Sequence, residues 1–326
     1  MKSVVATSLL AKSWSLRWKG VGSIDIESRW WTYSGDFVDF VNNMFEVLKR
    51  YTIHKFRLKW ENVVFGSPWL IEWLALAVCR KVRVVDVGVF SEDGKERHFV
   101  EFGVKLPGKL FSCKTLEILK LRGPFIINLP PRVAVCLPKL VHLELSLVHF
   151  KDEQKSLPKL VQGCPVLQSF RFDRKFWYNS CSVINWSISS PSLKHLDISL
   201  GDDGGGHLFE IGNGRNCKLE IDAPALEKLV LTDGLLGEIL IRGGSINEVD
   251  LDFISFGRAT DTYYQSLIVR LIQGLNHVKL LKLSERTMEV LGRAASELST
   301  TSLWSTRSLW PTTSFERLTK LVVKLH

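Results

Sequence analysis

Residues 116–121 read Leu-Glu-Ile-Leu-Lys-Leu, an apolar-x-x-apolar-x-apolar pattern that returns along the chain. Two further clear copies are Leu-Val-His-Leu-Glu-Leu at 140–145 and Leu-Gln-Ser-Phe-Arg-Phe at 167–172. The other copies begin at residues 53, 82, 193, 226, 246, 278 and 318, which makes ten at intervals of roughly 20 to 40 residues. The last three positions of each copy alternate apolar, variable, apolar. This alternation predicts a short strand that buries one face.

The segments between the copies indicate how these strands are connected. Several copies follow a proline, at Pro138, Pro165, Pro191 and Pro224, which fixes the backbone ahead of a strand. Helical spacing of apolar residues predicts amphipathic helices over 68–80 and 263–275, and 158–163 fits one helical turn. Ser296 to Pro311, rich in Ser and Thr, is expected to be a loop.

One short strand cannot bury its own apolar face, so the copies are expected to stack around a shared core. The fold class that we predict is α/β, an irregular leucine-rich-repeat solenoid shaped like a horseshoe. An ordinary α/β sheet is the alternative, because apolar alternation is common. A doubly wound nucleotide-binding fold would need a glycine-rich turn after its first strand, and none lies near the N-terminus.

Composition narrows the classes of partner and chemistry. Lys and Arg outnumber Asp and Glu by 43 to 34, a net charge of +9 that favours acidic partners. The basic residues are dispersed, so we expect neither nucleic acid nor a membrane as a partner. The six cysteines contain no C-x-x-C pair, and no Ser, His and Asp grouping has a catalytic context. We therefore expect no metal, no cofactor and no catalytic residues, and the lack of a signal-peptide pattern indicates a cytoplasmic or nuclear protein.

The polar residues inside the strand pattern should point away from the core and line the concave surface of the solenoid. We predict that they form the partner-binding face, and its candidate residues are Arg57, Lys59, Lys120, Arg122, Glu144, Arg171, Asp197, Asp250 and Asp252. The earlier copies are mostly basic here and the later ones turn acidic. The hypothesis is a ligand with acidic or phosphorylated groups toward the N-terminal half. The alternative is a merely soluble polar surface.

The first residues carry a second motif. Val4 to Trp18 reads VVATSLLAKSWSLRW, which resembles the second half of an F-box, with Trp14 and Trp18 as its distinctive pair. The string LFSCKTLEILKL at 110–121 and GCPVL at 163–167 are similar to the plant family that joins an F-box to leucine-rich repeats. The resemblance implies three parts: a partial, helical F-box at 1–20, a linker and capping helix at 21–52, and repeats at 53–326.

The resemblance also implies a function. Relatives of this kind are substrate receptors of SCF-type (Skp-cullin-F-box) ubiquitin ligases, non-catalytic subunits that hold the client protein on their repeats. The F-box would dock on a Skp-type adaptor, here through Leu9, Leu10, Trp14 and Trp18. Met1 falls inside the motif, so the alternative is a stand-alone repeat scaffold, or a truncated competitor that binds the client without binding the adaptor. The client itself is not encoded in a readable motif.

Overall fold

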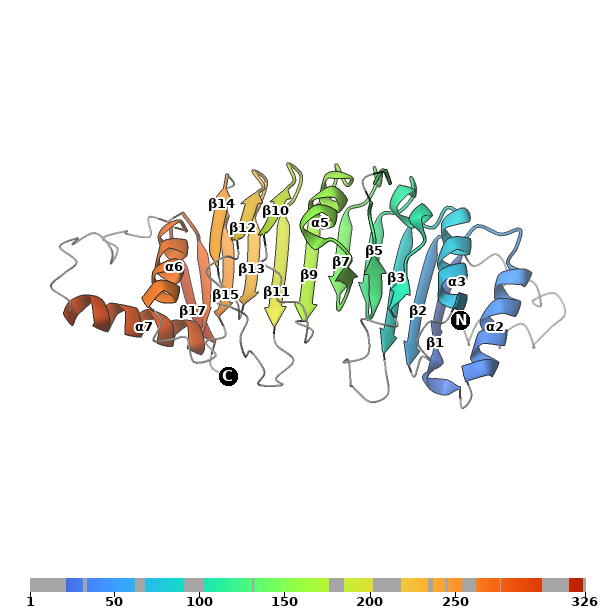
Figure 1. The fold of residues 1–326 in the computed structure, drawn as a ribbon, viewed down its shortest axis with the longest axis horizontal. Helices are drawn as coiled ribbons and strands as arrows, with labels where there is room; N and C mark the ends of the chain where they lie inside the picture. The colour runs from blue at the N-terminus through green and yellow to red at the C-terminus, as the bar shows by residue number, and fades with distance from the viewer. Residues whose placement is uncertain are drawn as a thin grey trace. The chain divides into compact units, whose positions relative to one another are not determined.

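The computed structural model describes residues 22–31, 34–61, 68–90, 103–130, 132–175, 185–201, 218–233, 237–243, 246–253, 262–275, 277–300 and 317–324. Its contacts divide the chain into an N-terminal unit, Met1–Leu167, and a C-terminal unit, Gln168–His326. Each unit is built on a parallel sheet, and Figure 1 shows the strands of each sheet running in one direction.

The N-terminal unit contains five of these parallel strands in the order of the sequence. They are β1 (Ser23–Glu27), β2 (Lys55–Glu61), β3 (Val84–Phe90), β5 (Ile118–Arg122) and β7 (His142–Ser146). The helices α2 (Ser34–Val47) and α3 (Pro68–Cys79) connect the first three strands. The short 3-10 helices η3 (Ser28–Trp30) and η5 (Gly108–Ser112) complete the early connections.

The C-terminal unit contains six parallel strands, again in the order of the sequence. They are β9 (Ser169–Lys175), β11 (His195–Gly201), β13 (Lys228–Asp233), β15 (Glu248–Phe253), β16 (Leu280–Ser284) and β17 (Lys320–Lys324). Two longer helices belong to the same unit, α6 (Thr262–Gln273) and α7 (Glu285–Thr300).

The segments that connect the main strands in the sequence form two small parallel sheets and one more helix. The N-terminal unit has β4 (Val104–Lys105), β6 (Phe125–Ile127) and β8 (His149–Phe150), followed by α5 (Glu153–Gln162). The C-terminal unit has β10 (Asn185–Ser189), β12 (Lys218–Asp222) and β14 (Glu238–Arg242). These segments form a second wall behind the main strands, as a stacked repeat requires.

The prolines that precede the strands lie in tight turns. Leu140 N–H donates to Leu137 O, Leu167 N–H to Cys164 O, and Leu226 N–H to Ala223 O. Pro138, Pro165 and Pro224 are each the second residue of one of these turns, where the fixed φ of proline fits the backbone. The leucine that ends each turn is fully buried, so the turn delivers the first apolar side chain of the repeat into the core.

A repeated backbone contact joins successive repeats within each unit. Glu117 O accepts from the N–H groups of both Val141 and His142, and Lys194 O accepts from Glu227 and Lys228 in the same way. The strands are therefore in register from their first residue. Their side chains alternate between a buried face and a partly exposed one. In β5 and β7, the second and fourth residues are buried and the other three are partly exposed.

Large side chains fill the core where α2 and α3 pack on the first strands. Phe37 of α2 contacts Trp60 of β2 and Trp73 of α3, with ring centroids 5.4 and 6.2 Å apart. The buried Trp73 ring donates from Nε1 to Asn42 Oδ1 at 2.8 Å, so its polar atom is satisfied. This layer covers the first strands, where Ile24 and Ile26 are 0% and 6% exposed.

All ten predicted copies contain a strand of the parallel sheets, which confirms the repeats. Helices α3 and α6 confirm the two amphipathic predictions, whereas α5 begins at Glu153, earlier than the single turn expected at 158–163. The horseshoe curvature stays a prediction. The F-box remnant also stays a prediction, because it lies outside the described residues.

Two sequence predictions are wrong in detail. Residues 21–52 were assigned to a linker and capping helix, but they also hold β1, which pairs with β2 over its whole length. The expected loop at 296–311 begins inside α7, which continues to Thr300. The buried positions of α7 have helical spacing, but Thr287 and Ala294 among them are not large apolar side chains, so the apolar pattern of this helix is weak.

Candidate binding surface: the polar face of each parallel sheet

The candidate site is the partly exposed side of each parallel sheet, which we call the polar face. In the N-terminal unit, the sheet register places one residue from each strand side by side. This central row is Asp25, Arg57, Asp86, Lys120 and Glu144. The charges therefore alternate from each strand to the next, and opposite charges on neighbouring strands attract.

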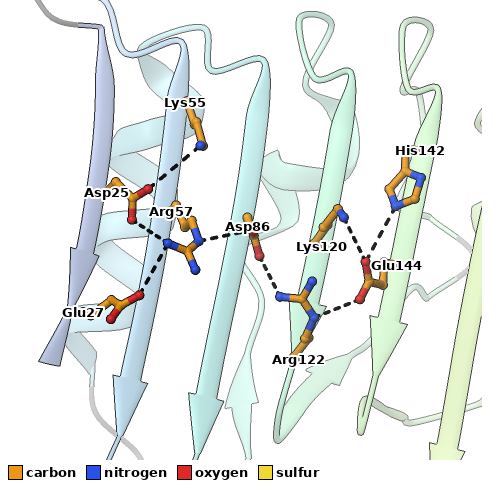
Figure 2. Close-up of polar contacts among 9 residues, drawn as sticks. All are labelled: Asp25, Glu27, Lys55, Arg57, Asp86, Lys120, Arg122, His142 and Glu144. Carbon is orange, nitrogen blue, oxygen red and sulfur yellow. Dashed lines mark hydrogen bonds and ion pairs between the residues drawn. The ribbon is translucent and has the colours of Figure 1, made fainter. Parts of the chain in front are cut away.

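The alternation produces a connected set of ion pairs, which Figure 2 shows across the five strands. Arg57 Nη1 lies 2.9 Å from Asp25 Oδ1, and Arg57 Nε lies 3.7 Å from Asp86 Oδ2. Arg122 contacts Asp86 at 3.0 Å and Glu144 at 2.8 Å. Lys120 completes the set with a contact of 3.2 Å to Glu144. We call this set the charge ladder.

Glu144 is the most enclosed carboxylate of the charge ladder, with its side chain 12% exposed. Burial acts to raise its pKa, but hydrogen bonds from Arg122 and Lys120 outweigh burial and hold the pKa below its ordinary value. Burial likewise acts to lower the pKa of Arg122. The hydrogen bond to Glu144 and the negative charge of Asp86 outweigh burial, so the pKa of Arg122 is raised. The pair is therefore held in its charged form.

His142 lies beside this pair, with Nε2 3.7 Å from Glu144 Oε2. Burial and the positive charge of Lys120 lower the pKa of His142, and the attraction of Glu144 only partly opposes them. The imidazole is therefore neutral at pH 7.

The polar face of the C-terminal unit distributes its charges differently. Its corresponding row is Arg171, Asp197, Val230, Asp250, Lys282 and Val322. Both carboxylates lie in the middle of this row, with one cation on each side of them. On β9, β11, β13 and β15, five carboxylates share the polar face with Arg171, Lys228 and His195. These carboxylates are Asp173, Asp197, Glu248, Asp250 and Asp252. Two lysines reach in from the last strands: Lys282 lies 2.7 Å from Glu248, and Lys324 lies 2.6 Å from Asp250.

Asp197 is a partly buried carboxylate among these charges. Burial raises its pKa above the ordinary value, Arg171 opposes the rise, and the negative charges of Asp173 and Asp250 add to it. Its ion pair with Arg171 spans 3.6 Å, and the Arg171 side chain is 54% exposed. Glu144 and Asp197 therefore lie in opposite electrostatic environments, whereas hydrogen bonds from Lys282 and Lys228 lower the pKa of Glu248 in the C-terminal unit.

All nine residues predicted for the binding face lie on the partly exposed side of a main strand. The structure brings Arg57, Lys120, Arg122 and Glu144 together in the charge ladder. Lys59 pairs with Glu61 at 2.7 Å on its own strand. Asp197 and Asp250 share a row in the C-terminal unit, and Asp252 lies one row further along.

The N-terminal polar face is not predominantly basic once β1 is included, while the acidic or phosphorylated ligand stays a prediction. Over the five described main strands of the N-terminal unit, five cations face five carboxylates: Lys55, Arg57, Lys59, Lys120 and Arg122 against Asp25, Glu27, Glu61, Asp86 and Glu144. Asp25 and Glu27 come from β1. A signal for this strand exists, since Val21, Ile24 and Ile26 have the spacing of the repeat.

The described residues offer little to other kinds of chemistry. In that part of the chain, no group of three or more His, Cys, Asp and Glu side chains is arranged to hold a metal ion. Burial raises the pKa of the Cys164 thiol to about 12, which makes it unreactive near neutral pH. None of the described helices is both long and apolar enough to cross a membrane.

Parallel strands in register, a core of matched leucines and a second wall of mixed structure define a leucine-rich-repeat protein of α/β type. Residues 70–247 match the family model described as the LRR repeats of FBD-associated F-box protein At5g56370. The chain belongs to this family, which confirms the resemblance seen in its sequence.

Curated relatives from Arabidopsis thaliana extend the match beyond these residues. The chain is 27% identical over 303 residues to F-box/FBD/LRR-repeat protein At2g26030, an alignment that covers 89% of this chain and 64% of the relative. It is 28% identical to F-box/LRR-repeat protein 13, with 89% and 62% covered. F-box/FBD/LRR-repeat protein At2g04230 is 33% identical over 237 residues, which cover 70% of this chain and 48% of the relative.

The chain therefore spans between about half and two thirds of the length of these three relatives. No solved structure matches the chain significantly.

Proposed function

We propose that this chain is a protein-binding module that serves as the substrate receptor of an SCF-type ubiquitin ligase. The observation that carries the proposal is the matched register of the polar faces, which presents variable charged side chains in fixed rows on rigid strands. Relatives named as F-box/LRR-repeat proteins support the adaptor-binding half of the proposal. The module holds a client and performs no chemistry itself, and it acts in the cytoplasm or nucleus.

The client binds the polar face in this proposal, at Arg57, Lys59, Lys120, Arg122, Glu144, Arg171, Asp197, Asp250 and Asp252. A rigid row of side chains favours binding, because little conformational freedom remains to be lost on association. In the N-terminal unit, a partner that broke the charge ladder would leave half-buried charges without their neighbours. We therefore expect its contacts to leave the ion pairs of that unit intact.

The adaptor contact belongs to residues 1–20, which lie outside the described residues. Leu9, Leu10, Trp14 and Trp18 are the side chains proposed to dock on a Skp-type adaptor. On a helix of the kind that the F-box resemblance implies, tryptophans four residues apart would share one face and supply the large apolar anchors typical of interface hot spots.

Co-purification tests this proposal. Residues 1–326 are expressed with a recombinant Skp-type adaptor, beside a variant that carries both Trp14→Ala and Trp18→Ala. Trp69→Ala is the matched control, because Trp69 of α3 is an exposed tryptophan outside the motif. We expect the adaptor to bind the unchanged chain and the control but not the double variant. Absence of adaptor from all three samples would favour the stand-alone scaffold, or a competitor that binds the client without delivering it.

A further inference from the structure

One edge of the N-terminal sheet gathers lysines that are far apart in the sequence. β3, β5 and β7 are parallel and in register, so all three begin at the same edge, as Figure 1 shows. Lys81, Lys114 and Lys139 each lie three or four residues before one of these strands, and all three are exposed. We call these three lysines the basic edge.

The turns that carry the basic edge lie side by side. Thr115 Oγ1 donates to Val82 O at 2.9 Å, which holds the turn of Lys114 against the turn of Lys81. The turn of Lys139 lies one strand further along the sheet. Neighbouring strands are about 4.8 Å apart, so the basic edge extends over about 10 Å across the sheet.

The lysines of the basic edge are not neutralised by nearby carboxylates. In the described turns that carry them, Glu117 is the only carboxylate. Arg83 already pairs with it, since Nε and Nη2 lie 2.8 and 2.9 Å from its two oxygens. The hydrogen bond from Arg83 and the positive charge of Lys139 lower the pKa of Glu117. The three lysines themselves make no ion pair within the described part of the chain.

Other charged surfaces of the molecule are better balanced. In the C-terminal unit, the corresponding edge pairs Lys194 with Glu227 of the next turn at 3.3 Å. The described residues of the N-terminal unit include 19 Lys and Arg against 12 Asp and Glu, although its polar face carries equal numbers of each. The positive surplus of this unit therefore lies away from the polar face, and the basic edge is part of it.

The N-terminal segment of the chain itself does not fit the basic edge by charge. Residues 1–21 precede β1, which begins at the same edge of the sheet as β2 and β3. They contain four Lys and Arg residues and neither Asp nor Glu. Because like charges repel, the complementary segment belongs to a partner.

Glu117 indicates which kind of partner fits. Its charged carboxylate lies among the lysines and would repel the continuous phosphates of a nucleic acid. A peptide can place an uncharged side chain there instead. Val141 is 37% exposed, and its N–H donates to Glu117 O at 2.8 Å, so an apolar side chain has a neighbour at this point.

We propose that the basic edge is a docking surface for a short acidic segment of a partner protein. The segment places carboxylates opposite Lys81, Lys114 and Lys139 and an apolar side chain against Val141. Complementary charges speed the encounter of two surfaces and discriminate among partners. The surface is separate from the polar face and from residues 1–20, so the proposal does not depend on adaptor binding.

Fluorescence anisotropy with the full chain tests the proposal. The probe is a tetramethylrhodamine-labelled peptide, Gly-Ser-Glu-Asp-Glu-Leu-Glu-Gly-Ser, beside a control peptide in which Gln and Asn replace the acidic residues. We expect saturable binding of the acidic peptide only. A variant with both Lys114→Glu and Lys139→Glu should bind it about tenfold more weakly, because each exposed ion pair contributes roughly two- to fivefold and charge reversal adds repulsion.

The matched control carries Lys279→Glu and Lys320→Glu, which change the net charge equally. Both lysines are exposed at the starts of strands in the C-terminal unit and make no ion pair within the described residues. Melting curves show that each variant is folded, and we expect the control to bind the acidic peptide as the unchanged chain does.

Equal weakening by the two double variants would overturn the proposal, since net charge alone would then attract the peptide. Absence of saturable binding would overturn it as well. Displacement of the peptide by a lower concentration of single-stranded DNA of equal charge would overturn it in favour of nucleic acid. Each of these results leaves the adaptor assay unaffected.

Discussion

The polar faces of the two units have the same origin in the repeat, but Glu144 of the first and Asp197 of the second lie in opposite electrostatic environments. In the N-terminal unit, cations and carboxylates alternate from strand to strand, and the pKa of Glu144 is lowered. In the C-terminal unit, Asp197 shares the face with Asp173 and Asp250, and its pKa is raised. The repeat fixes where the polar side chains lie, and the order of charges along each row decides whether they support the fold.

This difference separates two roles for the same position in a repeat. Where charges alternate, each side chain stabilises its neighbours, and loss of one leaves a half-buried charge without its partner. Where a carboxylate is buried beside other carboxylates, as Asp197 is, its ionisation opposes folding. The comparison predicts that equivalent substitutions will act differently in the two units.

The largest difference is expected between two arginines. Arg122→Met removes the cation that joins Asp86 to Glu144, and it should cost about 1–2 kcal/mol, since two half-buried carboxylates lose their donor. Arg171→Met removes a more exposed arginine with a single contact of 3.6 Å, and it should cost less than about 1 kcal/mol. Differential scanning calorimetry measures both. Equal losses would contradict the comparison.

A smaller effect is expected from Glu144→Gln, and it depends on pH. The folded-state pKa of Glu144 is lowered, so its contribution is fully present above the unfolded value of about 4.3 and is lost as the pH falls through the folded value. The variant should melt roughly 2–4 °C lower at pH 7, for a loss of about 1 kcal/mol. The difference should vanish in acid. Glu46→Gln, at an exposed helix pair, should leave the melting temperature unchanged at both pH values.

The smallest effect is expected from Asp197→Asn, and it has the opposite sign. The folded-state pKa of Asp197 is raised, so its ionisation opposes folding once the pH rises above the unfolded value of about 3.9. The variant should therefore be unchanged or up to about 1 kcal/mol more stable at pH 7. It should equal the unchanged protein in acid. A clear loss of stability at pH 7 would show that the Arg171 contact outweighs the crowding.

Much of the fold could be predicted from the sequence, because the repeated apolar positions are the buried positions of the strands. The leucines of each copy mark the residues that meet in the core, so their spacing identified ten main strands. β1 was missed although Ile24 and Ile26 fit the pattern, because the family resemblance placed residues 21–52 in a linker and capping helix. Strands such as β4 and β8 are only two residues long and carry no periodic signal.

The candidate face was predicted residue by residue, but its electrostatics were not. Which charges meet depends on the register between strands far apart in the sequence, 36 residues for Asp86 and Arg122 and 74 for Asp250 and Lys324. One missing strand was enough to make a balanced N-terminal face look basic, because Asp25 and Glu27 belong to β1. A local pattern identifies the outward positions, whereas their pairing is a property of the assembled sheet.

Glu144 and Asp197, one on each polar face, lie in opposite electrostatic environments. Carboxyl-carbon NMR titration measures this directly, with Asp and Glu selectively labelled and Glu144→Gln and Asp197→Asn used to assign the two signals. We predict that Glu144 titrates below the ordinary value for glutamate and Asp197 above that for aspartate. Shifts in the same direction, or in the reverse directions, would contradict the account.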